Sequence, residues 1–213
     1  MFYYERKLKR QGYTFVIGVD EAGRGPLAGP VVAAAVVLGS RKFKNRIDDS
    51  KKLSPLQRDK AFLEITAHTL FGIGIINEKL IDRLNILQAT RLAMENAVIS
   101  LIKKNKTRDK QRMHILVDGN VRLDTDIPLT NIIRGDAKSK SIASASILAK
   151  VTRDRIMHVY DKIYPEYGFS EHKGYPTYKH RLALKKFGLS SIHRVSFAPC
   201  QKSFASKLCP RIK

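Results

Sequence analysis

Cysteine, tryptophan and long apolar runs are scarce in this chain of 213 residues, and each absence argues against a class of protein. The two cysteines, Cys200 and Cys209, do not form a Cys-x-x-Cys pair, which argues against a disulfide framework or a zinc site and favours a reducing, cytoplasmic setting. No apolar stretch approaches the roughly 20 residues that span a bilayer. The N-terminal sequence MFYYERKLKR is charged and aromatic, so no secretory signal peptide is expected.

Acidic residues are also few, since 19 Asp and Glu stand against 40 Lys and Arg, giving a net charge of +21. Such a charge can serve solubility alone or reflect a basic proteome, but it is typical of domains that bind nucleic acid. No basic amphipathic helix with a bulky apolar face is evident, so a membrane surface is the less favoured partner. The basic residues are spread along the chain, which suits a groove that follows a phosphate backbone.

Apolar runs and helical spacing outline the secondary structure. Hydrophobic residues make up 43% of the chain, enough for a folded core. The expected strands span 14–20, 30–38, 70–76, 114–120 and 129–136, and the expected helices span 85–104, 141–164 and 176 to about 187. This order indicates an α/β layer with a more helical C-terminal part.

Acidic residues stand at the ends of three predicted strands: Asp20 and Glu21 after the first, Asp118 after the fourth, and Asp136 after the fifth. Aspartate often ends a strand simply because it favours turns. If the strands share one sheet, however, the four carboxylates converge and repel one another, and bound divalent cations remove that cost. Oxygen ligands in this number suit Mg²⁺ or Mn²⁺, and with a phosphate partner they predict metal-assisted phosphodiester hydrolysis.

A glycine-rich loop follows the first two acids. Its pattern Gly23-x-Gly25-x-x-Ala28 matches a dinucleotide-binding fingerprint, but Pro26, Gly29 and Pro30 break the helix that this fingerprint requires. A loop of this kind still allows close approach of the backbone to a phosphate or a sugar edge, because glycine has no Cβ.

Seven motifs occur in order along the chain: DEAGRGPLAGPVVAAAV (20–36), DSKKLS (49–54), NILQATRLAM (85–94), LVDGN (116–120), GD (135–136), SIASASILAKVTRDR (141–155) and HKGYPTYKH (172–180). Together they resemble bacterial ribonuclease HII, from about residue 14 to about residue 200. The related ribonuclease HIII is less similar, since it does not share the Gly-Arg-Gly loop. One departure is Leu80-Ile81-Asp82, where the family often has a Glu-Ile-Asp turn.

The resemblance implies an α/β, ribonuclease H-like fold, with a mixed central sheet flanked by helices and a C-terminal helical segment. Residues 1–213 would form a single catalytic domain, whose part from about 165 to 213 completes the substrate groove. The implied enzyme is a monomeric, metal-dependent endoribonuclease that uses Mn²⁺ or Mg²⁺, two ions with substrate bound. It would hydrolyse the RNA strand of RNA–DNA hybrids and nick 5′ of single ribonucleotides in duplex DNA, leaving 3′-hydroxyl and 5′-phosphate ends.

The resemblance also assigns residues. The catalytic and metal-binding acids would be Asp20, Glu21, Asp118 and Asp136. The groups that contact substrate would be Gly23, Arg24, Gly25 and Tyr175.

Plainer interpretations stand beside these assignments. Arg24 can be a surface cation, Tyr175 a packed aromatic, and Lys51 one of a solvated lysine pair instead of a phosphate ligand. His172 and His180 are expected to be polar surface residues, and the small residues around Ser141 predict close helix packing. A pure binding module and a different nuclease or integrase of the same fold are the competing functions, and metal dependence on an RNA–DNA hybrid separates them.

Overall fold

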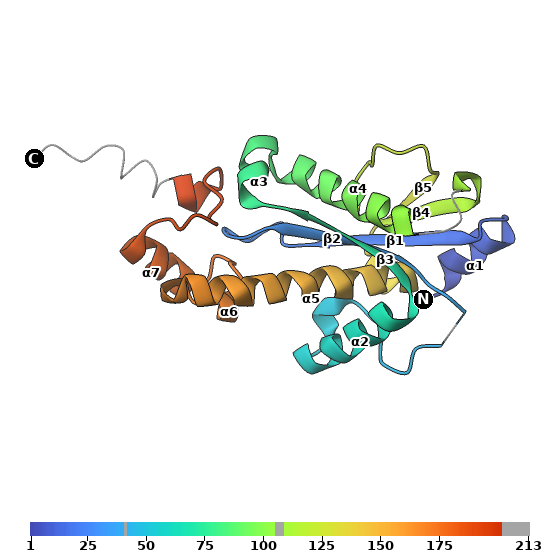
Figure 1. Cartoon of the computed structure of the whole chain (residues 1–213), viewed down its shortest axis with the longest axis horizontal. Helices are drawn as coiled ribbons and strands as arrows, with labels where there is room; N and C mark the ends of the chain where they lie inside the picture. The colour runs from blue at the N-terminus through green and yellow to red at the C-terminus, as the bar shows by residue number, and fades with distance from the viewer. Residues whose placement is uncertain (41, 105–108, 202–213) are drawn as a thin grey trace, which may run out of the picture.

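The computed structural model describes residues 1–40, 42–104 and 109–201, which form a mixed five-stranded sheet of order β3-β2-β1-β4-β5 (Figure 1). The strands are β1 (Phe15–Ala22), β2 (Val31–Val37), β3 (Leu70–Ile76), β4 (Met113–Asp118) and β5 (Leu129–Ile132). The first three strands pair antiparallel, whereas β4 pairs parallel to β1 and β5 parallel to β4. Four of the predicted strands are confirmed with small changes at their ends, whereas β5 ends at Ile132 and not at residue 136.

The helices fall before, between and after the strands. They are α1 (Tyr3–Arg10), α2 (Pro55–His68), α3 (Glu78–Leu84), α4 (Ile86–Lys104), α5 (Lys140–Ile163), α6 (Phe169–His172) and α7 (Tyr178–Phe187). Four short 3₁₀ turns join them: η1 (Ser50–Lys52), η2 (Lys110–Arg112), η3 (Gly135–Ala137) and η4 (Pro165–Tyr167). Helices α4, α5 and α7 match the predictions, whereas α1, α2 and α3 were not predicted.

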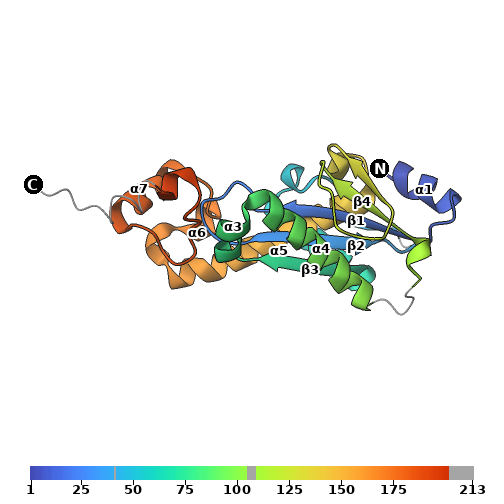
Figure 2. The same cartoon turned by 90° about the horizontal axis from the view of Figure 1, so that it is seen from above.

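Two long helices cover the sheet, α4 on one face and α5 on the other (Figures 1 and 2). Alternation along β1 explains the division, since Ile17 and Val19 belong to the core under α4 and Gly18 lies against α5. A Cβ at Gly18 would collide with the backbone of Ser141, so glycine is needed for α5 to pack this closely. The predicted packing of small residues is thereby confirmed.

The far end of α5 extends beyond the sheet and carries residues 164–201, which we call the C-terminal lobe (Figure 2). Its apolar core includes Tyr167, Phe169 and Ile192, packed against Met157 of α5 and Ala28 of the loop between β1 and β2. Helix α1 lies at the opposite end of the molecule (Figure 1). No helix within the described ranges has the length and apolar character needed to cross a membrane.

Candidate active site

Asp20 and Asp118 lie next to each other at the carboxyl ends of two adjacent parallel strands. The register of β1 and β4 pairs Val19 with Val117, so the two aspartates follow at the same level. Each shares a sheet face with the residue two positions before it, and that face is covered by α5. Asp20 is buried, whereas Asp118 is half-buried. Of the four acids expected to converge, Asp20 and Asp118 thus occupy neighbouring positions at one end of the sheet.

The charge around Asp20 favours a bound cation. Burial raises the pKa of Asp20 well above its ordinary value, and the charges of Glu21 and Asp118 raise it further. The Glu21 amide donates a 2.7 Å hydrogen bond to Asp20 Oδ1, which only partly offsets these effects. A buried carboxylate beside two others is therefore costly until a positive ion neutralises it.

Asp136 reaches the same region from a turn and not from a strand end. The prediction that a strand continues to residue 136 is wrong, because β5 ends at Ile132 and Arg134 adopts a left-handed conformation (φ 56°). The Gly135 amide donates a 2.6 Å hydrogen bond to Asp118 Oδ1, which ties the turn η3 to the end of β4. Burial raises the pKa of Asp136, and the charges of Asp49 and Asp118 add to the shift.

Asp49 is a fifth acid near this region, and it was not predicted. Its side chain accepts a 2.9 Å hydrogen bond from the Lys51 amide at the start of η1. Its charge is the largest electrostatic influence on both Asp136 and Lys51. The motif DSKKLS begins with Asp49, although a role was predicted only for its lysine Lys51. We refer to Asp20, Glu21, Asp49, Asp118 and Asp136 as the acidic cluster.

Lys51 is exposed at the mouth of the acidic cluster. Burial alone lowers the pKa of Lys51, but the charges of Asp49, Asp136, Asp20 and Asp118 outweigh it and raise the pKa. This environment differs from that of an ordinary solvated lysine. An open cavity of about 430 Å³ lies here, lined by Asp49, Lys51, Lys52, Asp118, Arg134, Asp136 and Ala137.

The acidic cluster fits a divalent cation in charge and in ligand chemistry. In this conformation, no three of the described His, Cys, Asp and Glu side chains form a complete metal-binding group. Carboxylate oxygens are nevertheless the ligands that Mg²⁺ and Mn²⁺ prefer. A cation would also remove the repulsion that raises the pKa values of Asp20 and Asp136.

The glycine loop, residues 23–30, begins directly behind the acids. Gly23 is buried with φ +98°, whereas Arg24 and Gly25 are exposed. Arg24 Nη1 lies 3.2 Å from Glu21 Oε1, so this arginine is ion-paired with the acidic cluster at the surface. A Cβ at Gly25 would lie 3.6 Å from Tyr175 Cε1, which places the loop and the tyrosine side by side. Tyr175 itself is 42% exposed.

His172 and His180 do not lie on the surface, so that prediction is wrong. His172 is 8% exposed and His180 is fully buried, and their ring centroids stack 4.4 Å apart. A third histidine, His193, comes from the chain after α7 and brings its Nε2 within 3.0 Å of His180 Nε2. Burial outweighs the polar character of these side chains because each ring nitrogen has a hydrogen-bond partner.

Backbone partners fix which nitrogen atoms donate and which accept in the hydrogen-bonded pair of His193 and His180. The Ser190 amide donates to His193 Nδ1, so the proton of His193 is on Nε2 and points at His180. His180 Nε2 therefore accepts, and its Nδ1–H donates to the carbonyl of Tyr175 over 2.9 Å. Burial lowers the pKa of His180 to about 4 and that of His193 to about 3, so both rings are neutral at physiological pH.

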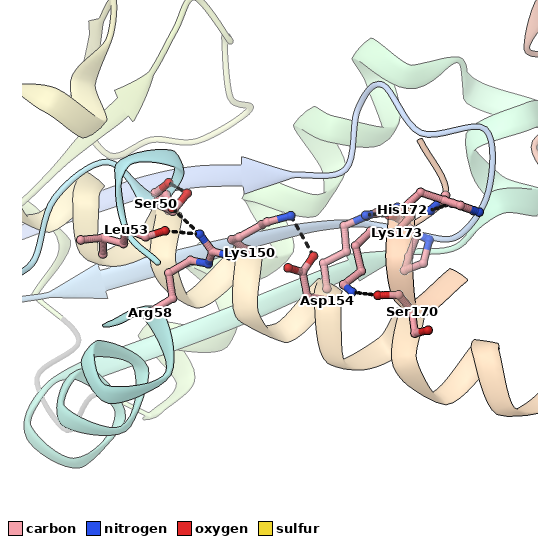
Figure 3. A network of polar contacts seen from close by, with 12 residues as sticks. Ser50, Leu53, Arg58, Lys150, Asp154, Ser170, His172 and Lys173 are labelled. Atoms are coloured by element: carbon pink, nitrogen blue, oxygen red, sulfur yellow. Dashed lines mark hydrogen bonds and ion pairs between the residues drawn. The ribbon is translucent and has the colours of Figure 1, made fainter. Parts of the chain in front are cut away.

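Separate groups of polar contacts lie along α5, between the turn that carries Lys51 and the C-terminal lobe (Figure 3). Arg58 donates to the carbonyls of Ser50 (2.9 Å) and Leu53 (2.5 Å) and so fixes the turn that carries Lys51. Further along α5, Lys150 and Asp154 form a 2.9 Å ion pair. Lys173 then donates to the carbonyl of Ser170 in the C-terminal lobe. Helix α5 thus packs against both the turn that carries Lys51 and helix α6 of the C-terminal lobe.

A mixed five-stranded sheet with a long helix on each face defines the ribonuclease H-like class, and solved structures agree with this assignment. The ribonuclease H2 structure from Pyrococcus horikoshii OT3 matches with a TM-score of 0.71 and 26% identity, covering 89% of this chain and 97% of that one. The Mn²⁺ complex of Bst-RNase HIII matches with a TM-score of 0.68 and 16% identity, covering 93% and 71%.

Sequence comparison then narrows the class to one family. The family model described as Ribonuclease HII matches residues 17–200. Ribonuclease HII of Acholeplasma laidlawii is 49% identical over 200 residues, which cover 93% of this chain and 95% of that protein. The chain therefore belongs to the ribonuclease HII family. It is a type HII ribonuclease H, an endoribonuclease for RNA–DNA hybrids from a family that depends on divalent metal ions.

Proposed function

We propose that this enzyme, besides cutting the RNA strand of hybrids, nicks duplex DNA on the 5′ side of a single embedded ribonucleotide. The products are a 3′-hydroxyl and a 5′-phosphate. The observation that carries the proposal is the position of the exposed Gly25 against the Tyr175 ring, directly behind the acids of β1. The loop proposed to recognise the ribose and the ring proposed to recognise the neighbouring deoxyribose thus lie side by side, next to the acidic cluster.

In this proposal the acidic cluster provides the hydrolytic centre. Asp20 and Asp118 hold the metal from adjacent strand ends, and Glu21 and Asp136 complete the ligand set and orient the attacking water. When bound, Mg²⁺ or Mn²⁺ activates water and neutralises charge at the scissile phosphate, with two ions present in the substrate complex. Lys51 holds a backbone phosphate from the mouth of the cluster.

The glycine loop and Tyr175 distinguish the sugars. A 2′-hydroxyl both donates and accepts hydrogen bonds, and the exposed backbone at Arg24 and Gly25 can approach it closely. Tyr175 presses its ring on the neighbouring deoxyribose, where a second 2′-hydroxyl would crowd it. The cut therefore falls at the DNA-to-RNA junction.

The C-terminal part of the chain completes the groove for the duplex. Helix α7, whose basic residues include Lys179 and Arg181, lies beyond the end of the sheet that carries the glycine loop (Figure 1). The whole chain then acts as a single catalytic domain and a monomer. The part of the predicted groove at residues 202–213 lies outside the described residues.

A labelled DNA duplex with one ribonucleotide, resolved on a denaturing gel, tests the proposal. The expected result is one nick 5′ of the ribonucleotide that a DNA polymerase can extend, and no cut in the all-DNA duplex. Cutting restricted to hybrids with several consecutive ribonucleotides would contradict it, and so would a product without a 3′-hydroxyl.

A further inference from the structure

Two arginines behind the glycine loop are among the largest fully buried side chains of the protein. Arg153 of α5 is 1% exposed, and Arg194 of the C-terminal lobe has no exposed surface. A guanidinium keeps its charge in nearly every protein environment, so its burial is costly unless all of its donors are used. Within the described ranges, neither arginine forms an ion pair with a carboxylate.

Arg194 directs its donors at the carbonyls of the glycine loop. Its Nη2 donates to Gly23 O over 2.6 Å and to Gly29 O over 2.8 Å. Its Nη1 donates to Arg24 O over 3.0 Å, and its Nε donates to Gly29 O over 2.9 Å. The planar fork thus links the two ends of the loop, which a lysine ammonium cannot do with the same geometry.

Arg153 supports the loop from α5 and also reaches the turn before Tyr175. It donates to Pro30 O over 2.9 Å, to Ala28 O over 3.1 Å and to Lys173 O over 3.0 Å. A Cβ at Gly23 would collide with the Arg153 side chain. The glycine at this position is therefore needed for the arginine behind it, and not only for access by a substrate.

These contacts decide which backbone groups the loop presents to solvent. The carbonyls of Gly23 and Arg24 are directed inward at Arg194. The amides of Arg24 and Gly25 have no hydrogen-bond acceptor among the described residues, and both residues are exposed. Backbone hydrogen bonds to the C-terminal lobe hold the second half of the loop, at Leu27 and Gly29. The carbonyls of Gly23 and Arg24, in its first half, are held by Arg194.

We propose that Arg194 and Arg153 are positioning residues that set the glycine loop in the conformation that distinguishes ribose from deoxyribose. The inference rests on the proposed function, in which this loop reads the sugar. The competing explanation is a structural clamp that stabilises the fold and has no effect on sugar discrimination. A specificity ratio separates the two, since general destabilisation changes affinity for both duplexes alike.

The experiment uses Asp118→Asn as a parent that binds without cutting. Fluorescence anisotropy in the presence of Mg²⁺ gives the Kd for an all-DNA duplex and for the same duplex with one ribonucleotide. The specificity ratio is the Kd for the all-DNA duplex divided by the Kd for the duplex with one ribonucleotide. We expect Arg194→Lys to lower this ratio by about fivefold to tenfold, the effect of losing one hydrogen bond. Arg153→Lys should lower the ratio less, because Arg153 makes no hydrogen bond to Gly23 O or Arg24 O. Arg155→Lys, two positions along α5 and exposed, is the matched control and should leave the ratio unchanged.

A milder variant keeps the test decisive if Arg194→Lys does not fold. Asp82 accepts hydrogen bonds from the amides of Val195 and Ser196, both at 2.9 Å, and so fixes the segment that carries Arg194. Asp82→Ala should lower the ratio about twofold to threefold without creating a buried cavity. An unchanged ratio in both variants, with a lower Tm, would establish a structural clamp and overturn the inference. If the parent itself shows no preference for the ribonucleotide, the proposed function fails first, before any arginine is changed.

Discussion

The acidic cluster and the C-terminal lobe satisfy their polar groups in opposite ways. In the cluster, Asp20 and Asp136 have raised pKa values because burial and like charges disfavour their ionised forms. In the lobe, the buried histidines and Arg194 have hydrogen-bond partners at every polar side-chain atom. Among the described residues, the buried side-chain atoms without a partner lie elsewhere, on Glu5, Glu78, Thr90 and His114. In the proposed function, the hydrolytic region is thus incomplete without a cation, whereas the region assigned to substrate recognition is already assembled.

The largest effect should come from removing one acid. Asp118→Asn is expected to reduce cleavage of an RNA–DNA hybrid by about a thousandfold or more, since a lost metal ligand removes several kcal/mol of transition-state stabilisation. Affinity for the hybrid should be kept or slightly increased, because an anion near the phosphates is gone. Single-turnover cleavage and filter binding measure the two effects, and a variant that cuts at the wild-type rate with Mg²⁺ or Mn²⁺ would contradict the site assignment.

Acidification should change the contributions of the two regions to the free energy of unfolding in opposite directions. His180 and His193 have native pKa values of about 4 and about 3 because of burial, well below the ordinary 6.5. The unfolded chain therefore binds protons that the native lobe does not, and this contribution to stability is lost as the pH falls through about 6.5 towards 4. Asp20 has a raised pKa, so its contribution is lost as the pH rises.

Urea unfolding at about pH 7.5 and about pH 5 tests this difference. His180 and His193 should each lower the free energy of unfolding by about 2 kcal/mol at the lower pH. His193→Asn should lose part of that dependence, whereas His158→Gln, on the exposed side of α5, should keep it. Equal pH dependence in both variants would show that the buried histidines do not contribute.

Tyr175→Ala should have a smaller and more selective effect. We expect cleavage at a single ribonucleotide to fall about tenfold, and cleavage of a long hybrid to fall less, because only the junction depends on the ring. Tyr178→Ala, which removes a 77% exposed tyrosine three positions away, is the matched control. Competitive cleavage of the two substrates in one tube measures the ratio directly, and an equal loss on both would remove Tyr175 from junction recognition.

The smallest effect should come from Lys51→Ala. Removing a positive charge near Asp49 and Asp136 should tighten Mn²⁺ binding to the free protein by a few-fold and weaken hybrid affinity by a similar factor. Lys52→Ala should change metal binding less, because Lys52 lies 3.9 Å from Asp48. Titration calorimetry with Mn²⁺ decides the point, and weaker metal binding in Lys51→Ala would contradict it.

The sequence predicted what depends on local pattern. An apolar run that ends on Asp20 and Glu21 is a strand, and small residues after Ser141 form the helix that packs on it. The signal for α2 was present and overlooked, since Ser54 and Gln57 form a capping box with Pro55 at the first helical position. The sequence therefore contained enough information to predict this helix.

The parts that the sequence could not predict depend on contacts between distant segments. Nothing local indicates that His193 lies beside His180, or that Arg194 reaches the carbonyl of Arg24. Both residues are polar, and polar residues are usually exposed, so their burial becomes evident only when the partners are in place. The prediction that a strand continues to Asp136 was wrong for a related reason. The turn at Arg134 depends on contacts with the neighbouring strand end and not on β propensity.

The bond between Arg194 and the Arg24 carbonyl joins residues 170 positions apart, and this spacing has a consequence for synthesis on the ribosome. The acids of β1 are translated well before Arg194, which contacts the adjoining loop. A nascent or prematurely terminated chain therefore has its first metal ligands long before it has the means to orient a sugar. Closure of so long a loop is also slow relative to local folding. If Arg194 positions the loop as proposed, selective cutting is a property that the enzyme acquires only after this arginine has been translated.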